Sequence, residues 1–296
     1  MPPHDISPLT RVVTRIDRLR DGDGEVDAAI IPTGFPSLDH AIGGGFRRGA
    51  LMVLGGDDGV GASAFALAMA LRIRERTLML TSEMPPERAY ERALAMTARV
   101  PLDALRLGVV DEFARARLAA AAVALRDQAP IIDTLGAGGT DAVQEAAAAV
   151  PPPAVIIVDG LEALLAQDHR TAPRMGPRMG PRMGYDRDDA LAAAVLAMKR
   201  VALSCNAAVL LLTHLPSLDR ARADRRPRLT DFGVRGAVGT HADLVMGLYR
   251  EEQYDGDLGV TGAAELLLLK SRDGALGYVD LYFSAECIRF EDVLDG

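Results

Sequence analysis

The sequence predicts an α/β fold with a mostly parallel central sheet that is covered by helices on both faces. Three observations support this prediction. Apolar runs of strand length alternate along the chain with longer segments of helical periodicity, as in parallel sheets. The runs are apolar throughout, which is typical of strands buried on both faces. A glycine-rich loop joins the first long apolar run to the helix that follows it.

The first 28 residues are predicted to form an amphipathic linker helix and a flexible joint. Apolar side chains recur at helical spacing between charged ones, at Leu9, Val12, Val13, Ile16 and Leu19. The polar run DGDGEVD follows at residues 21–27 as the joint. A helix this short cannot bury its apolar stripe alone, so it must dock on its own domain or on a neighbouring subunit.

Residues 29–296 are predicted to form the main domain, with strands and helices in alternation. Its expected strands lie at residues 50–54, 77–80, 131–132, 154–158 and 208–213. Its expected helices lie at residues 63–74, 87–99, 111–126, 140–150 (capped by Thr140) and 189–203. Three later runs, at residues 244–249, 264–270 and 277–283, predict strands separated by turns and hence a hairpin-rich carboxyl-terminal edge.

Composition limits the possible functions. The 296 residues are 49% hydrophobic but only 4% aromatic, so aliphatic side chains must build the core. A net charge of −8 gives no average attraction for nucleic acid, so any DNA contact must come from local basic loops. Cys205 and Cys287 form no disulfide or zinc pattern and suit a reducing cytoplasm. We expect a cytoplasmic protein, because the sequence shows neither a signal peptide nor a membrane span.

Residues 56–63 read GDDGVGAS and form a phosphate-binding loop that lacks its lysine. Gly56, Gly61 and Ser63 fit the pattern G-x-x-x-x-G-K-[ST], but Ala62 stands at the lysine position. Backbone N–H groups and the positive end of the next helix would still cradle phosphates. Two aspartates inside the loop add negative charge where a polyphosphate is expected. We assign nucleotide contacts to Gly56, Gly59, Val60, Gly61, Ala62 and Ser63.

Two acids at strand ends complete the predicted site. Asp159 ends the apolar run AVIIVD, the position of a magnesium-holding aspartate in proteins with this loop. Its alternative role is to cap the following turn. Glu83 ends the strand after the loop helix, so it also lies at the carboxyl edge of the sheet, where ligands bind. A carboxylate there can orient or deprotonate a water molecule, although an isolated surface glutamate is the alternative.

These segments resemble the RecA-like ATPase domain of the DnaB-type replicative helicases. The matching stretches are IPTGFPSLDHAIGGGFRRGALMVLGG, TSEMPPERA, VIIVDGLEALL, LLLTHLPS, ADLVMGLYREEQY and LLLKSRDGALGYVDLYF. The similarity extends from about residue 8 to residue 290. The glycine loop alone also resembles the RadA and KaiC branch of the same superfamily. The resemblance implies a RecA-like P-loop NTPase core, ATP and Mg²⁺ as cofactors, and a homo-oligomer, a hexameric ring in which the linker helix docks on the adjacent subunit.

The resemblance also implies roles for individual residues. Ser63 would bind magnesium through its hydroxyl, Asp159 would be the Walker B acid, and Glu83 would be the catalytic glutamate. Lys270 and Arg272 lie two apart on a strand and hence on one face. In the family such a pair reaches the γ-phosphate held by a neighbouring subunit. Ordinary solvation of an edge strand is the alternative for these two cations.

Two arginine-rich loops predict contact with single-stranded DNA. Residues 173–184 repeat PRMG three times, and proline and glycine at this spacing exclude both helix and strand. In the helicase ring, loops near these positions grip DNA phosphates, which requires charge more than shape. The expected contacts are Arg174, Arg178 and Arg182 in the first loop and Arg220, Arg222, Arg225 and Arg226 in the second. A solvated surface loop, or a repeat expanded by replication slippage, is the alternative.

Three positions depart from the family pattern. Ala62 replaces the lysine, His214 replaces the glutamine that couples nucleotide state to the DNA loops, and residues 233–234 lack an Arg-Glu pair. A cation from elsewhere, such as Arg47 or Arg48, could replace the lysine. Two hypotheses therefore remain: a motor that uses ATP and Mg²⁺ to move along DNA, and a non-hydrolysing DNA-binding scaffold ring. A RadA- or KaiC-like regulatory ring is a third.

Overall fold

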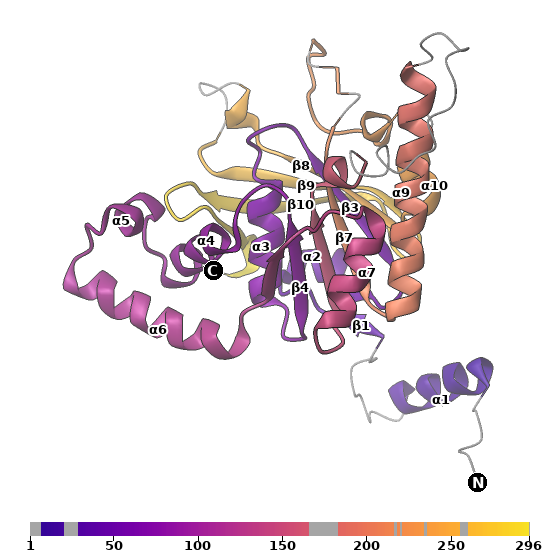
Figure 1. Ribbon diagram of the computed structural model, residues 1–296, viewed down its shortest axis with the longest axis horizontal. Coiled ribbons are helices and arrows are strands. Elements are labelled where there is room, and N and C mark those ends of the chain that lie inside the picture. Colours follow the sequence, from indigo (N-terminus) through magenta and orange to yellow (C-terminus); the bar gives the residue numbers. More distant parts are fainter. Residues whose placement is uncertain are drawn as a thin grey trace.

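A large central sheet forms the core of the computed structural model, which describes residues 7–20, 29–165, 183–215, 218–219, 221–233, 236–254 and 260–295 (Figure 1). Its parallel strands are β3 (Leu51–Gly56), β4 (Thr77–Thr81), β5 (Ile131–Thr134), β6 (Val155–Asp159), β7 (Ala208–His214) and β8 (Leu244–Tyr249). The antiparallel strands are β9 (Ala263–Ser271), β10 (Gly277–Ser284) and β11 (Arg289–Asp292). Within the described residues the strand order is β11-β10-β9-β8-β3-β7-β6-β4-β5.

The sheet topology confirms the predicted α/β class. Strand β3 lies in the middle, with β7 on one side and β8 on the other, both parallel to it. Strands β8, β9, β10 and β11 follow one another as antiparallel neighbours and make the expected hairpin-rich edge. A separate two-stranded ribbon pairs β1 (Ile30–Ile31) with β2 (Phe46–Arg47) just before the sheet begins.

Helices cover both faces of the sheet. One core packs α2 (Pro36–Ala41), α3 (Ala62–Arg72) and α4 (Pro86–Ala98) against side chains such as Met52 and Leu54. The opposite core packs α7 (Thr140–Ala149), α9 (Met183–Cys205) and α10 (Ala237–His241) against the alternate side chains, among them Leu51 and Val53. Successive residues of β3 therefore enter different cores, as the pleat of a strand requires. This two-sided burial explains why the strands are apolar throughout.

Two further helices extend the domain beside α4. They are α5 (Leu102–Leu107), which the sequence analysis did not predict, and α6 (Glu112–Gln128). The Asp111 carboxylate caps α6 by accepting a hydrogen bond of 2.6 Å from the N–H of Ala114. The predicted cap of α7 was wrong: Thr140 is already helical, and Gly139 occupies the capping position.

The predicted helix near the amino terminus is α1 (Pro8–Arg20), which lies apart from the sheet in Figure 1. Its side chains Leu9, Val12, Val13 and Ile16 are exposed. The stripe is therefore not buried against the main domain. Among the helices that the structure describes, none combines the length and apolarity needed to cross a bilayer.

Candidate nucleotide-binding site

The loop between β3 and α3 has the backbone of a phosphate cradle. Gly59 and Gly61 have φ angles of 79° and 98°, in the left-handed region that favours glycine. A Cβ atom on Gly61 would lie 3.1 Å from the ring of Phe290. Gly61 is also the N-cap of α3, and within the described chain no side chain caps that end of the helix. The first N–H groups of α3 lie at the positive end of the helix dipole and can therefore bind an anion.

One residue of the loop belongs to the core. The side chain of Val60 is buried and does not line the cavity, and its N–H donates a hydrogen bond of 3.2 Å to the carbonyl oxygen of Asp57. This hydrogen bond closes a turn within the loop, and the predicted nucleotide contact of Val60 stays a prediction. The buried Val60 side chain therefore supports the loop from the core of the protein.

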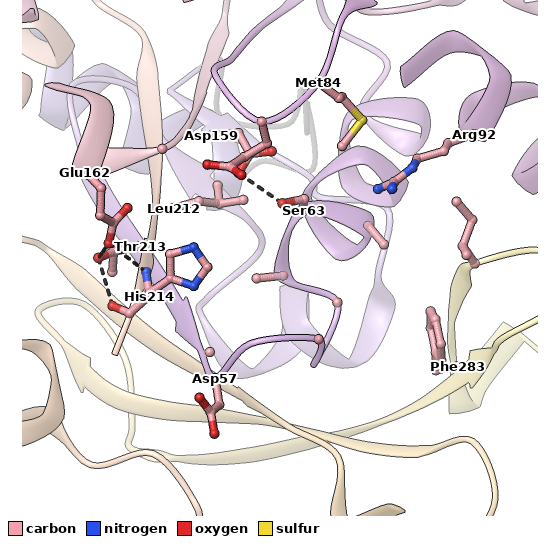
Figure 2. Close-up of a pocket in the computed structure, with 18 residues that line it drawn as sticks. Asp57, Ser63, Met84, Arg92, Asp159, Glu162, Leu212, Thr213, His214 and Phe283 are labelled. Carbon is pink, nitrogen blue, oxygen red and sulfur yellow. Dashed lines mark hydrogen bonds between the residues drawn. The ribbon is translucent and has the colours of Figure 1, made fainter. Parts of the chain in front are cut away.

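A cavity of about 430 Å³ opens above this loop at the carboxyl ends of the parallel strands (Figure 2). The predicted site residues that line it are Gly56, Gly59, Gly61, Ala62, Ser63, Glu83, Asp159 and His214. They come from four separate stretches of chain, which meet here because parallel strands end at the same edge. The structure therefore brings these predicted residues together in one cavity.

The Ser63 hydroxyl and the Asp159 carboxylate form the centre of the cavity. Ser63 Oγ donates a hydrogen bond of 3.0 Å to Asp159 Oδ1. The other oxygen of Asp159, Oδ2, is buried and has no hydrogen-bond partner among the described residues. Burial is the main reason that the pKa of Asp159 is raised to about 6, and the nearby Glu83 carboxylate raises it as well. The hydrogen bond from Ser63 acts in the opposite direction and lowers this pKa.

The Ser63–Asp159 pair fits a nucleotide that is bound together with a magnesium ion. An unpartnered carboxylate oxygen beside a hydroxyl provides hard oxygen donors of the kind Mg²⁺ prefers. A Cβ atom on Gly61 would press on the buried Phe290 ring, so glycine there lets the loop and the start of α3 keep this backbone path. Ser63 and Asp159 would hold the metal ion, and the loop backbone would hold the phosphates.

His214 closes the cavity at the end of β7. Its Nδ1 lies 3.0 Å from Oδ1 of Asp58, one of the two acids in the glycine loop. Glu162 accepts hydrogen bonds from the backbone N–H of His214 (3.0 Å) and from the Thr213 hydroxyl (3.1 Å), which orients this strand end (Figure 2). The sequence analysis missed Glu162, although its place one turn after Asp159 could have suggested it.

Arg92 is a second charged residue of the cavity that the sequence analysis missed. It projects from α4, and Figure 2 shows its guanidinium directed toward the part of the cavity where Ser63 lies. Its Nε is buried without a hydrogen-bond partner among the residues described. Burial lowers its pKa, as does the positive charge of Arg106, while the carboxylate of Asp159 acts in the opposite direction.

Neither Arg47 nor Arg48 can replace the loop lysine in the cavity of its own chain. Both residues lie just before β3, at the opposite, amino-terminal edge of the parallel strands. Arg47 Nε lies 3.3 Å from a carboxylate oxygen of Asp273, and Arg48 pairs with Glu75. These side chains lie at the start of β3 and the cavity lies at its end, so the length of the strand separates them.

Lys270 and Arg272 also lie at that opposite edge, because β9 runs antiparallel to β8. Lys270 Nζ donates to the carbonyl oxygens of Gly239 (2.6 Å) and Ala242 (2.5 Å), at the end of α10. Arg272 Nε lies 3.2 Å from Oδ1 of Asp243. The chain does not bring this pair to its own cavity, so a role at a neighbour's site stays a prediction.

The second arginine loop is held to the domain by ion pairs. The Arg222 guanidinium donates to both carboxylate oxygens of Asp231 at 2.9 and 2.8 Å. Arg226 makes a similar fork to Glu265 at 2.7 and 2.5 Å. These two arginines are thus engaged within the chain, and the expected DNA contact remains a prediction for them.

The other predicted DNA contacts differ in what the structure says of them. The guanidinium of Arg225 lies over the ring of Tyr254, 5.0 Å from its centre. Four of the predicted contacts lie outside the described residues, namely Arg174, Arg178, Arg182 and Arg220.

The parallel sheet and the loop at its carboxyl edge define the fold class, which is the RecA-like core of the P-loop NTPases. Residues 30–292 match the DnaB-like helicase C terminal domain, and the chain belongs to that family.

Known relatives agree with this assignment. The chain is 25% identical to the replicative DNA helicase DnaB of Haemophilus influenzae (strain ATCC 51907 / DSM 11121 / KW20 / Rd) over 99% of its own length and 62% of that protein. It is 27% identical to the replicative DNA helicase DnaB of Leifsonia xyli subsp. xyli (strain CTCB07), covering 98% of this chain and 62% of the relative. The chain therefore spans about three fifths of the length of these curated relatives.

Solved structures show the same fold. One solved ATPase domain superposes with a TM-score of 0.80 at 20% identity, covering 98% of this chain and 99% of that one. A DnaB-like replicative helicase, solved in a study of its interactions with primase, gives a TM-score of 0.78 at 20% identity. This second match covers 98% of the present chain and 67% of the helicase.

Proposed function

We propose that this chain is an ATP-binding subunit of a DnaB-like ring that acts on single-stranded DNA, in replication or a related process in the cytoplasm. The observation that supports it best is the Ser63–Asp159 pair under the open end of α3. ATP would bind with its phosphates over the loop, and Mg²⁺, once bound by Ser63 and Asp159, would neutralise phosphate charge. Family membership and the replicative helicases among the relatives support the DNA substrate.

The residues of this chain have separate tasks in that scheme. The loop backbone orients the phosphates, and Asp159 keeps an unpartnered oxygen for the metal ion. The Glu83 carboxylate would position the attacking water and accept its proton. His214, held by Glu162 through its backbone, would face the terminal phosphate. Ala62 offers no charge, and a lost lysine–phosphate contact weakens binding by about 1.5–3 kcal/mol, at least about tenfold.

The same alanine favours a second candidate, a non-hydrolysing ring that binds DNA as a scaffold. Measurement of phosphate release with single-stranded DNA present separates the two. A wild-type rate that disappears in Asp159→Asn supports the motor. A wild type with no rate, together with activity that appears only in Ala62→Lys, supports the scaffold.

We also propose that the ring is a homohexamer and that the arginine loops line its DNA channel. The exposed stripe of α1 supports assembly, since it has no partner surface within the described domain. The Lys270 and Arg272 pair, at the edge opposite the cavity, would face the nucleotide of the next subunit. For DNA, we expect that replacing Arg174, Arg178 and Arg182 by glutamine flattens the salt dependence of binding. An unchanged slope would exclude the loop as a DNA contact.

A further inference from the structure

We propose that Arg92 replaces the missing loop lysine as the cation that contacts the phosphates. The inference rests on the nucleotide site proposed above and goes beyond it by naming the residue that compensates for Ala62. Arg92 lines the same cavity as Ser63 and Asp159, and Figure 2 shows its guanidinium turned toward Ser63.

The negative charge of the cavity lining favours a cation that can contact the phosphates. Four carboxylates line it, from Asp57, Glu83, Asp159 and Glu162. Among the described residues that line the cavity, Arg92 is the only arginine or lysine. A polyphosphate would therefore enter a strongly anionic space, in which one permanent positive charge has a large effect.

The Nε of Arg92 is buried without a hydrogen bond in the described part of the chain, and an unsatisfied buried donor costs free energy. Arg117 and Arg289 also have a buried Nε without a hydrogen bond, but each donates another N–H to a backbone carbonyl oxygen, whereas Arg92 makes no hydrogen bond or ion pair among the described residues. Burial and the charge of Arg106 lower the pKa of Arg92, so the guanidinium would gain from a nearby anion. By contrast, Arg222 and Arg226, which hold a loop in place, each bind a carboxylate with both arms.

The chemistry of the guanidinium fits the task. Arginine keeps its charge when partly buried and binds two phosphate oxygens with a planar fork. It enters the cavity from α4, whereas a loop lysine would enter from the start of α3. Two different elements can therefore supply the same charge, and α4 is the one that does so here.

The test compares four proteins by their affinity for a fluorescent magnesium ATP analogue: wild type, Arg92→Gln, Ala62→Lys and the double variant. If Arg92 compensates for the lysine, its loss weakens binding at least about tenfold in the wild type. In the Ala62→Lys background the same loss has a clearly smaller effect, because the lysine then supplies the charge. The corresponding AMP analogue, which lacks the outer phosphates, should bind wild type and Arg92→Gln alike.

The controls separate charge from folding. Arg115→Gln removes an exposed arginine on α6, away from the cavity lining, and should leave affinity within about twofold of the wild type, as expected for a solvent-screened charge. Arg92→Lys should bind between wild type and Arg92→Gln, because it keeps the charge but loses the fork. Equal losses from Arg92→Gln in both backgrounds, or no loss in either, overturn the role of Arg92. Wild-type protein that binds no nucleotide overturns the proposed function as well.

Discussion

At the scale of a single residue, burial of Asp159 opposes the ionisation that metal binding would require. Asp159 must be ionised to hold a metal ion, yet it is only 3% exposed, and burial raises its pKa to about 6. The ionised form is therefore unfavourable until a cation arrives. At about 1.4 kcal/mol per pH unit, the ionised carboxylate costs on the order of 3 kcal/mol of folding stability at neutral pH. A magnesium ion bound at the proposed site would favour the ionised form and so offset this cost.

The Asp159→Asn substitution should therefore stabilise the protein without nucleotide or magnesium. The folded-state pKa lies above the usual 3.8, so the native state holds this proton more tightly than the unfolded chain. The wild type thus loses stability as pH rises from near 4 to near 6, and the asparagine variant does not. Thermal melts across this range should show an advantage for Asp159→Asn that grows with pH and levels off above pH 6. An advantage independent of pH would contradict this account.

The site residues that could be predicted from the sequence are those whose position depends on strand ends alone. Glu83 and Asp159 follow or end apolar runs, and Ser63 follows the glycine loop at the end of β3, so the parallel topology places all three at one edge. Arg92 was missed because its place depends on the rotation of α4 about its axis, which spacing along the chain does not fix. Glu162 was missed for a related reason, since its contacts are made to the end of a different strand.

At the scale of elements, the phosphate cradle depends on the start of α3. Gly61→Ala should lower both stability and nucleotide affinity. The alanine would adopt an unfavourable φ of 98°, which costs about 1–2 kcal/mol, and its Cβ would press on the Phe290 ring. Gly108→Ala is the matched control, because Gly108 also has a positive φ (68°) but has nothing within 4 Å of an added Cβ. Denaturant unfolding and nucleotide titration measure both effects, and equal losses in the two variants would contradict the role of Phe290.

The loop that carries Arg222 is a second element whose conformation depends on one contact. The Arg222–Asp231 fork is largely buried, with side-chain exposures of 15% and 4%. Arg222→Ala leaves the Asp231 charge without its partner, so we expect a loss of about 3 kcal/mol in the free energy of unfolding. Urea denaturation measures it, with Arg225→Ala as a control that should change much less, since that guanidinium contacts a ring rather than a carboxylate. Similar losses in both variants would show that the fork does not fix the loop.

The elements predicted correctly are those with a strong periodic signal. The central strands were recognisable because both faces are buried, and α3 and α6 because each follows a clear loop or cap. The short helices α2, α5 and α10 and the strand β11 were missed. A helix of six residues or fewer makes less than two turns and gives no helical periodicity to detect, and β11 forms because it pairs with the edge of β10. Tertiary pairing, rather than local preference, determines such elements.

At the scale of the whole molecule, the exposed apolar face of α1 supports the proposed assembly. Its apolar side chains are between 41% and 73% exposed at Leu9, Val12, Val13 and Ile16. A second set of exposed apolar side chains lies at α5 and the start of α6, at Leu107, Val109 and Phe113. Surfaces of this kind are typical of contacts between proteins. Docking of α1 on the next copy of the chain would bury one or both surfaces and generate a closed ring if the rotation permits.

This leads to a prediction about molecular mass in solution. Ile16→Asp places a charge in the centre of the α1 stripe, and it should shift the protein from the oligomer toward the monomer because burying an unpaired charge is unfavourable. Thr14→Asp is the matched control, since it adds the same charge to an exposed polar position of the same helix and should leave the mass unchanged. Light scattering after size exclusion, at several protein concentrations, measures the effect. If wild type and Ile16→Asp have the same mass at every concentration, α1 does not hold subunits together, and the stripe must have another partner.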